Sequence, residues 1–293
     1  MISSLVYSKG DVKRVEFSSL NLSTSVSWIK VKQPSLKEIE LISQKTEIPN
    51  YMIRNFLDKY ELPRVEDYKD NKLIILKTYS NGKQGTFGAV LSKKYLITIF
   101  NDDITDEVND EDFKKGVDGV LYRVLESHVK DYAQQIEEIE DSLDKAETVI
   151  FKRPDNQNIE EVFMFRRKLI YLRKVLTANK PVIEPLAKDN PEFLLILTEI
   201  NQQIEREVTE STRLTTLLDM HMNAVSNNLN AIMKKFTVIA ALILLPTLVS
   251  GIYGMNFKFI PLAEKEFGFY FALLIMLGCV VLMFLYFKGK KWV

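Results

Sequence analysis

The chain has 293 residues, and its 39 Lys and Arg side chains balance 39 Asp and Glu side chains. A net charge of zero does not support binding of nucleic acid, so no nucleic-acid partner is expected. The single cysteine and two histidines exclude a disulfide framework and a zinc site built from Cys and His alone.

The first 116 residues have the pattern of an α/β domain with a sheet and flanking helices. Strands are expected at residues 26–34, 72–79, 86–91 and 95–100, each an apolar run next to a turn signal. No phosphate-binding loop, nucleophile elbow or metal-binding histidine pair occurs. We therefore expect neither an enzyme nor a cofactor, and we assign no catalytic residue.

Two short helices are expected between the first two strands. Ser35 and Glu38 have the spacing of a capping box, which predicts a helix that begins there. A second helix should begin near Pro49. The residues expected to face the sheet are Leu36, Ile39, Ile42, Met52, Ile53 and Phe56.

An acidic stretch, residues 101–112, follows the last expected strand. Asp102, Asp103 and Asp106 are candidates for a regulatory Mg2+ site, since this ion prefers oxygen ligands. The stretch lacks the central glycine and the closing glutamate of an EF-hand loop. The alternative is a solvated loop before a helix N-terminus, where acidic side chains are favourable.

Residues 117–190 predict a helical hairpin. The first helix, from Val117 to about Phe151, is acidic on one side, and the second, about Ile159 to Ala178, is basic. The sequence Arg153-Pro-Asp-Asn separates them. We expect the two helices to pack antiparallel through complementary charged faces.

Residues 191–257 predict one helix of roughly 90 Å, because no proline or glycine interrupts the chain between Pro191 and Pro246. Its apolar run, about 236–253, is long enough to cross most of a bilayer core. Apolar residues at heptad spacing lead toward this run and would hold neighbouring copies together, although a lone coiled-coil rod is an alternative. This apolar seam consists of Leu218, Met222, Val225, Leu229, Ile232, Phe236 and Ile239.

One face of the same helix is mostly small or polar. We call it the polar stripe, and it consists of Asn230, Met233, Thr237, Ala240, Leu244, Thr247 and Gly251. Polar groups in hydrocarbon are costly, so the stripe should face another helix or water. It could pack against a helix through its small residues, or it could line a pore in which Met233 and Leu244 form apolar constrictions.

The first span ends at Tyr253, Gly254, Met255 and Asn256. Gly254 can adopt a positive φ and stop the helix. Copies of Asn256 around an axis would form a ring of neutral oxygens. Such a ring could hold Mg2+ through its hydration shell, because this ion gives up water reluctantly. We therefore expect these four residues to form the loop that selects the cation at the outer mouth.

A loop at 258–268 leads to a second apolar span at 269–287, and residues 288–293 form a basic tail. Lys234 and Lys235 flank the first span on the same side as this tail. By the positive-inside rule both termini are cytoplasmic, and the loop lies outside. We therefore expect a multi-pass protein of the cell membrane, with the lipid bilayer as a partner.

These features together resemble the CorA family of magnesium channels, in the superfamily of two-span channels with a Gly-x-Asn loop. The stretches that carry the resemblance are GIYGMNF (251–257), YFKGKKW (286–292), ELPRVEDY (61–68) and KKYLITIF (93–100). The resemblance implies a homopentamer that passes hydrated divalent cations, most of all Mg2+, with Co2+ or Ni2+ as further cargo. It also implies that the hairpin at 117–190 lies beside a central stalk.

Three residues differ from what the resemblance leads one to expect. Where the family places acidic residues that bind regulatory Mg2+ between subunits, this sequence has Arg54, Asn55 and Leu195. Weak regulation by internal Mg2+ is therefore expected. Two other functions remain open: a zinc transporter of the same superfamily, and a membrane-anchored sensor or scaffold, which would need no polar stripe.

Overall fold

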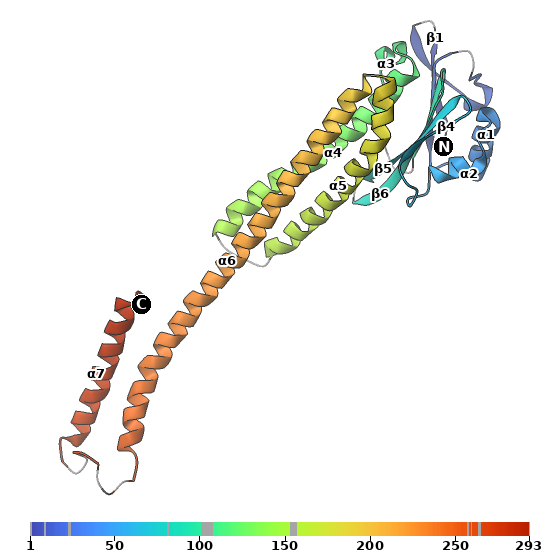
Figure 1. Cartoon of the computed structure of the whole chain (residues 1–293). Coiled ribbons are helices and arrows are strands. Elements are labelled where there is room, and N and C mark those ends of the chain that lie inside the picture. The colour runs from blue at the N-terminus through green and yellow to red at the C-terminus, as the bar shows by residue number, and fades with distance from the viewer. Residues whose placement is uncertain are drawn as a thin grey trace. The chain divides into compact units, whose positions relative to one another are not determined.

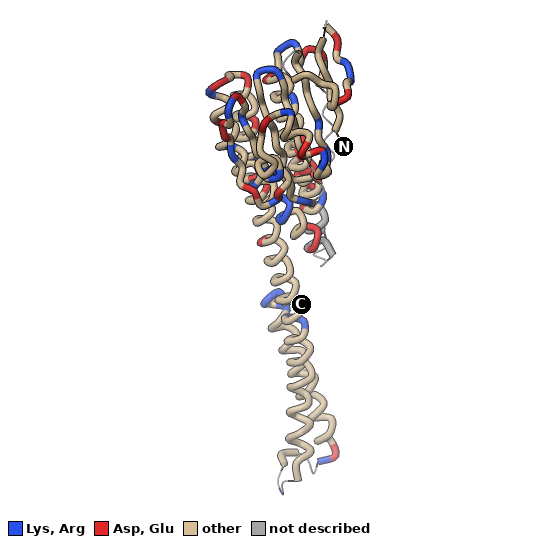
Figure 2. Tube along the Cα trace, turned by 90° about the vertical axis from the view of Figure 1, so that its right-hand side faces the viewer, with Lys and Arg blue, Asp and Glu red and all other residues tan. Residues whose placement is uncertain are grey.

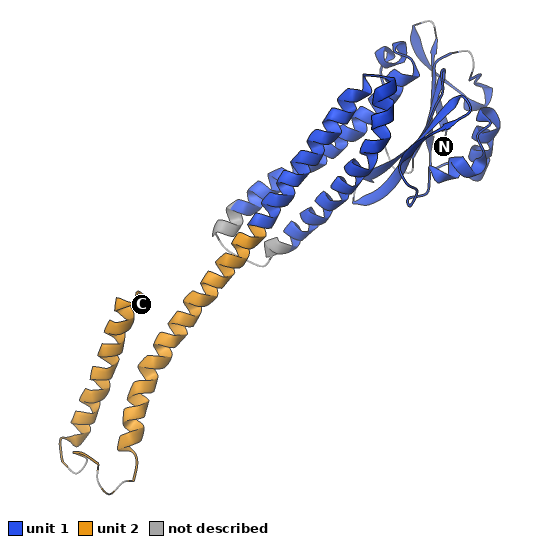
Figure 3. Ribbon diagram, viewed as in Figure 1, with its two compact units in different colours: residues 1–216 blue, residues 217–293 orange. Residues whose placement is uncertain are grey.

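The computed structural model describes residues 2–8, 10–22, 25–80, 82–100, 108–152, 157–256, 258, 260–262 and 265–292, without the side chains of 148–152 and 157–159. The chain divides into two compact units, residues 1–216 (unit 1) and residues 217–293 (unit 2). Figure 3 shows that the division falls inside one long helix. Unit 1 therefore combines the expected α/β segment, the helical hairpin and the beginning of the long helix.

Unit 1 is built on a seven-stranded sheet with the order β2-β1-β3-β7-β6-β5-β4 (Figure 1). The strands are β1 (Ile2–Ser8), β2 (Asp11–Val15), β3 (Ser27–Lys32), β4 (Arg64–Tyr68), β5 (Asn71–Ser80), β6 (Lys83–Leu91) and β7 (Tyr95–Phe100). Neighbouring strands are antiparallel except β3 and β7, which are parallel. The four expected strands are confirmed, whereas β1, β2 and β4 were not predicted. The edge strands β2 and β4 carry no fully buried residue that would mark them in the sequence.

The helices α1 (Leu36–Thr46) and α2 (Asn50–Asn55) cover one face of the sheet (Figure 1). The capping box is confirmed, since the Ser35 N–H donates to Glu38 Oε2 at 2.8 Å and the Glu38 N–H donates to Ser35 Oγ at 3.4 Å. Leu36 was expected in the core but is 64 % exposed, because it lies in the first turn, before the residues that reach the sheet. The core on this face includes Ile29, Val31, Ile39, Ile42, Ile53, Phe56, Val90, Ile97 and Ile99.

Helix α2 approaches β6 at a glycine. A Cβ atom added to Gly88 would lie 2.2 Å from Cγ of Phe56, which is far inside van der Waals contact. Only a residue without a side chain allows the buried Phe56 side chain to pack this close to the strand. Thr86 on the same strand donates its hydroxyl to the Phe56 carbonyl at 2.8 Å, so the end of α2 is held at a defined position.

The opposite face of the sheet packs against α4 (Val117–Lys152) and α5 (Gln157–Asp189), which follow the short helix α3 (Asp110–Lys114). Strand residues alternate between the two faces, and Trp28 and Phe87 belong to the side that carries α4. Trp28 is 1 % exposed and donates its indole N–H to Thr98 Oγ1 at 3.1 Å. The sheet is thus buried on both faces.

Helix α5 is longer than expected. It was predicted to end near Ala178, but it continues through Pro181 and Pro185 to Asp189. The two prolines are four residues apart and exposed, so the carbonyl groups that lose their helical partners face water. The opposite side of these turns is buried against the sheet, and Asn179 holds it there. Its amide accepts from the Lys77 N–H at 2.8 Å and donates to the Lys77 carbonyl at 2.9 Å.

The expected charge pairing between α4 and α5 is largely wrong. Among the described residues, Lys168 and Glu138, 3.3 Å apart, form the ion pair between these two helices. Three other acidic residues of α4 pair with arginines of the long helix α6 (Phe193–Tyr253): Glu140 with Arg206 at 3.0 Å, and Asp144 and Glu147 with Arg213. The physical reason is that α6 runs beside α4, which places Arg206 and Arg213 within ion-pair distance of these carboxylates.

Unit 2 contains the rest of α6 and the helix α7 (Gly268–Gly289), which runs antiparallel to it (Figure 1). Charged residues are concentrated in unit 1, whereas most of unit 2 is uncharged (Figure 2). Both α6 and α7 contain stretches long and apolar enough to cross a membrane, and few residues of these stretches are buried.

Candidate cation path on helix α6

All members of the polar stripe lie on α6, and all are exposed. Its two bulky members are Met233, which is 63 % exposed, and Leu244, which is 64 % exposed. They are 11 residues apart, or roughly 16 Å along the helix axis, and three helical turns bring them back to the same side. The stripe therefore has the arrangement that a path with two apolar narrow points requires.

The two hydroxyl groups of the stripe form hydrogen bonds within the helix. Thr237 Oγ1 donates to the Met233 carbonyl at 2.8 Å, and Thr247 Oγ1 donates to the Ile243 carbonyl at 2.7 Å. This pairing lowers the cost of placing them in hydrocarbon, so their polarity alone does not require a neighbour. It also leaves the oxygen lone pairs directed outward as acceptors. The water molecules of a hydrated cation donate hydrogen bonds outward, and these oxygens can accept them.

The apolar seam is a second uncovered surface of α6. Met222 is 66 % exposed, Leu229 57 %, Phe236 65 % and Ile239 54 %. Uncovered apolar surface of this extent marks an interaction surface. Residues at heptad spacing fit a second helix of the same kind. This arrangement supports assembly from more than one copy.

Helix α6 ends at the four residues that the sequence assigns to selection. Tyr253 is its last residue, Gly254 lies in a turn, and Met255 and Asn256 are exposed. The expected left-handed Gly254 is wrong, because the glycines with positive φ in the described part of the chain are Gly10, Gly82 and Gly116. The Gly254 N–H instead donates to the Ser250 carbonyl at 2.9 Å, and the Met255 N–H donates to the Ile252 carbonyl at 3.2 Å. The helix therefore ends in a tightened turn, after which Asn256 is free of helical geometry.

The proposed regulatory residues are placed only in part. Asp102, Asp103 and Asp106 lie outside the described residues. Arg54 is exposed on α2, and Leu195 is 63 % exposed in the first turn of α6. In the part of the chain that the structure describes, no three His, Cys, Asp or Glu side chains are close enough together to hold a metal ion.

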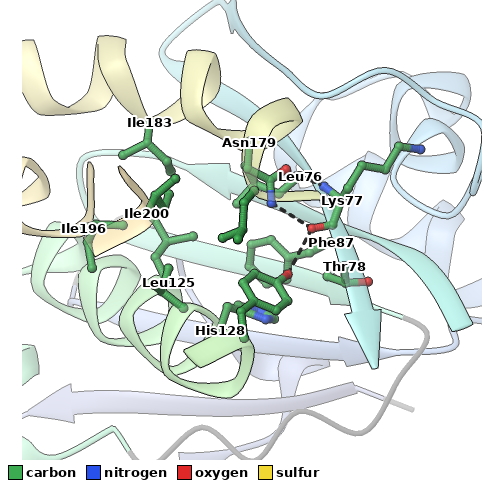
Figure 4. A pocket seen from close by; sticks show the side chains of 13 residues that line it. Leu76, Lys77, Thr78, Phe87, Leu125, His128, Asn179, Ile183, Ile196 and Ile200 are labelled. Atoms are coloured by element: carbon green, nitrogen blue, oxygen red, sulfur yellow. Dashed lines mark hydrogen bonds between the residues drawn. The ribbon is translucent and has the colours of Figure 1, made fainter. Parts of the chain in front are cut away.

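A small cavity lies where the sheet meets α4, α5 and α6 in unit 1 (Figure 4). Its volume is about 20 Å³, slightly more than one water molecule needs. The Lys77 carbonyl at its edge accepts from Asn179 at 2.9 Å and from the Tyr132 hydroxyl at 3.2 Å. Apolar side chains form most of the remaining wall, which the sequence did not predict.

His128 contributes an imidazole to the wall of this cavity. Its ring lies 4.9 Å from the Phe87 ring in an edge-to-face arrangement. Its Nε2 atom is buried and has no hydrogen-bond partner among the described residues. Burial lowers the pKa of His128 to about 4, so the imidazole is neutral at physiological pH. No pattern in the sequence marks this residue, since its neighbours come from five different elements.

Comparison with known proteins identifies the family of the chain. A family model described as CorA-like Mg2+ transporter protein matches residues 23–290. The cobalt/magnesium transport proteins CorA of Thermotoga maritima and Methanocaldococcus jannaschii are each 26 % identical to this chain. The former match covers 92 % of this chain and 84 % of the relative, and the latter covers 91 % of each.

The expected fold class, an N-terminal α/β unit followed by long helices and two C-terminal apolar helices, is confirmed by a solved structure. The complete structure of the CorA magnesium transporter from Methanocaldococcus jannaschii has a TM-score of 0.89 and 24 % identity, and covers 100 % of this chain and 99 % of that chain. Because the matching family model runs from the strands of unit 1 to the end of α7, the chain belongs to the CorA-like Mg2+ transporter family.

Proposed function

We propose that this chain forms a homopentameric channel in the cell membrane that passes hydrated divalent cations, chiefly Mg2+, into the cytoplasm. The observation that carries the proposal is the polar stripe, whose small side chains and outward-directed oxygens are exposed along a membrane-length helix that ends at Asn256. The names of the matched relatives, cobalt/magnesium transport proteins, support Mg2+ and Co2+ as cargo. Ni2+ is a further candidate.

The cation keeps its water shell along this path. A ring of Asn256 carbonyl oxygens at the outer mouth accepts hydrogen bonds from the coordinated waters and does not replace them, which suits an ion that loses water reluctantly. Thr247 and Thr237 continue the same kind of contact further along the helix. Leu244 and Met233 narrow the path, and apolar narrow points close when they lose their water.

Assembly follows from the apolar seam. A single copy leaves the seam exposed to solvent or lipid, whereas a ring of copies buries it between neighbouring α6 helices. The seam and the polar stripe share α6 but occupy different faces, so burying the seam leaves the stripe free to face the axis. The number of copies is tested by the mass of the purified complex, and five is expected.

The orientation follows from the lysines. Lys234 and Lys235 precede the first span, and Lys288, Lys290 and Lys291 end the second. The positive-inside rule places all five on the cytoplasmic side, with the loop at 258–268 outside. Modification of a cysteine introduced at position 290, in a Cys279→Ser background, should require access from the cytoplasmic side.

Cation entry into liposomes with purified protein tests the function directly. Asn256→Ala should abolish Mg2+ entry while the oligomer stays intact, because the change removes the carbonyl ring and no core packing. Asn228→Ala is the matched control, since Asn228 is exposed on the opposite side of α6 from Asn230. Undiminished entry through the Asn256→Ala protein would remove this residue from selection.

The same liposomes separate the alternatives. Entry of Zn2+ in strong preference to Mg2+ would indicate the zinc transporter. Absence of any cation entry from a correctly assembled protein would favour the sensor or scaffold. We expect entry of Mg2+ and Co2+, and loss of both in the Asn256→Ala protein.

A further inference from the structure

We propose that the C-terminal end of α7 binds the phosphate groups of anionic phospholipids in the cytoplasmic leaflet. The inference rests on the proposed membrane position of α7. It is carried by a helix cap that holds three lysines and a tryptophan in one place, and by the lack of acidic residues in the sequence around them.

The cap is a Schellman motif. The Trp292 N–H donates to the Phe287 carbonyl at 3.0 Å, and the Lys291 N–H donates to the Lys288 carbonyl at 3.0 Å. Lys291 occupies the left-handed position of the motif, with φ of 58°. Glycine is the residue that this conformation favours. Lys291 therefore carries a positive charge at a position where glycine would form the cap with less strain.

The cap also positions the tryptophan. The Trp292 ring stacks on the Phe287 ring, with the centroids 5.6 Å apart and 22° between the planes. Phe287 is buried, and Trp292 is half-buried beside it. Trp side chains are enriched where hydrocarbon meets the polar headgroups of a membrane. The motif therefore places Trp292 at the depth of the headgroups, next to the lysines.

Two more lysines lie at the same end of unit 2. Lys235 precedes the end of α6 at Tyr253 by roughly 27 Å, and Lys288 follows the start of α7 at Gly268 by roughly 30 Å. Because α7 runs antiparallel to α6 (Figure 1), these lengths put Lys234 and Lys235 at about the level of the α7 lysines. All five side chains are exposed.

Nothing in the sequence of this region balances these charges. No Asp or Glu occurs between Asp219 and Asn256 or between Phe267 and Trp292. Anionic lipids attract clusters of lysine directly beside a membrane span. Bound lipid phosphates would also reduce the repulsion that five lysines per copy exert on a cation that leaves the path, which gives the site a role in transport.

Lipid retention tests the proposal without any ion gradient. The complete protein is reconstituted in phosphatidylcholine nanodiscs with a minor fraction of phosphatidylglycerol, and the phosphatidylglycerol that remains bound after detergent extraction is quantified. The variant combines Lys288→Gln, Lys290→Gln and Lys291→Gly, which removes three charges and preserves the left-handed cap. The control combines Lys258→Gln and Lys265→Gln, which removes charge at the other end of unit 2.

We expect the C-terminal variant to bind phosphatidylglycerol about tenfold or more weakly than the unmodified protein, and the control to bind it equally well. Equal retention by all three proteins, or displacement of the lipid by inorganic phosphate, would overturn the proposal. Displacement by inorganic phosphate would mean that the site binds free phosphate from solution. Since no cation flux is measured, failure of the channel function would leave this result unaffected.

Discussion

Arg213 of α6 donates a hydrogen bond to Glu147 of α4, with 2.6 Å between Nη2 and Oε2, and another to Asp144. These hydrogen bonds raise the pKa of Arg213, which therefore remains a cation. The other terminal nitrogen of Arg213, Nη1, lies 3.9 Å from Oε2 of Glu210, which is one turn earlier on the same helix. Burial raises the pKa of Glu210, and so do the nearby carboxylates of α4. Arg213 therefore joins two helices and also offsets a buried negative charge.

Arg213→Ala should lower the free energy of unfolding of unit 1 by about 1–3 kcal/mol, more than an exposed ion pair contributes, because Glu210 loses its nearest cation. Fluorescence of the buried Trp28 in denaturant, in a Trp292→Phe background, measures it. Arg166→Ala is the control, since Arg166 is exposed on α5, and its effect should stay below about 0.5 kcal/mol. If the two changes lower the free energy of unfolding equally, the ion pairs of Arg213 contribute no more to stability than an exposed side chain does.

His128 predicts a pH dependence of stability. Its pKa is about 4 in the folded protein against an ordinary value of 6.5. Between these values the unfolded chain binds more protons, so stability falls as pH falls from 6.5 to 4, by about 3 kcal/mol in total. Above pH 6.5 both states are neutral and the effect is absent. Below pH 4 both states are protonated and the loss is complete.

His128→Leu should remove this part of the pH dependence. The measurement is the difference in unfolding free energy between the two proteins at pH 7 and at pH 4.5. Between pH 7 and pH 4.5 the unmodified protein should lose more unfolding free energy than the leucine variant does. If the unfolding free energies of the two proteins change with pH in the same way over this range, His128 must gain a hydrogen-bond partner when it is protonated.

Leu244→Ser should raise the resting leak of Mg2+ through reconstituted protein, because a hydroxyl keeps water in an apolar narrow point. Ile243→Ser is the matched control. Ile243 is 62 % exposed, nearly the same as Leu244, but it lies on the neighbouring side of the helix. Leak is measured in liposomes, with the oligomer verified by cross-linking. A leak that stays the same in the Leu244 variant, or rises equally in both, would exclude Leu244 from the path.

Regulation by internal Mg2+ should be weak, with half-closure at about millimolar concentration or above, the range of weakly liganded sites. The exposed Arg54 repels cations, and Leu195 offers no oxygen ligand. Current through purified channels is recorded while internal Mg2+ is raised stepwise. Closure at micromolar Mg2+ would contradict the prediction. Asn55→Asp combined with Leu195→Asp should move half-closure to lower Mg2+.

Local patterns predicted much of the fold and placed the candidate path on one helix, while the role of that path stays a prediction. The Ser35 and Glu38 capping box, the four central strands and the two apolar spans are each marked by a pattern of residues close together in the sequence. The polar stripe follows from helical periodicity alone, since α6 is continuous from Phe193 to Tyr253, with Pro246 inside it. Gly254 was misjudged because a glycine permits a left-handed turn but does not require one.

By itself the sequence determined the membrane spans, the long helix, the stripe and the loop that ends at Asn256, because periodicity and apolar length act within one segment. Only the tertiary structure decided that α5 passes through Pro181 and Pro185, that the acids of α4 pair with Arg206 and Arg213, and that His128 is enclosed. Each of these depends on a partner from a distant part of the chain. Burial against the sheet offsets the hydrogen bonds lost at the prolines, and the proximity of α6 to α4 determines which charges meet.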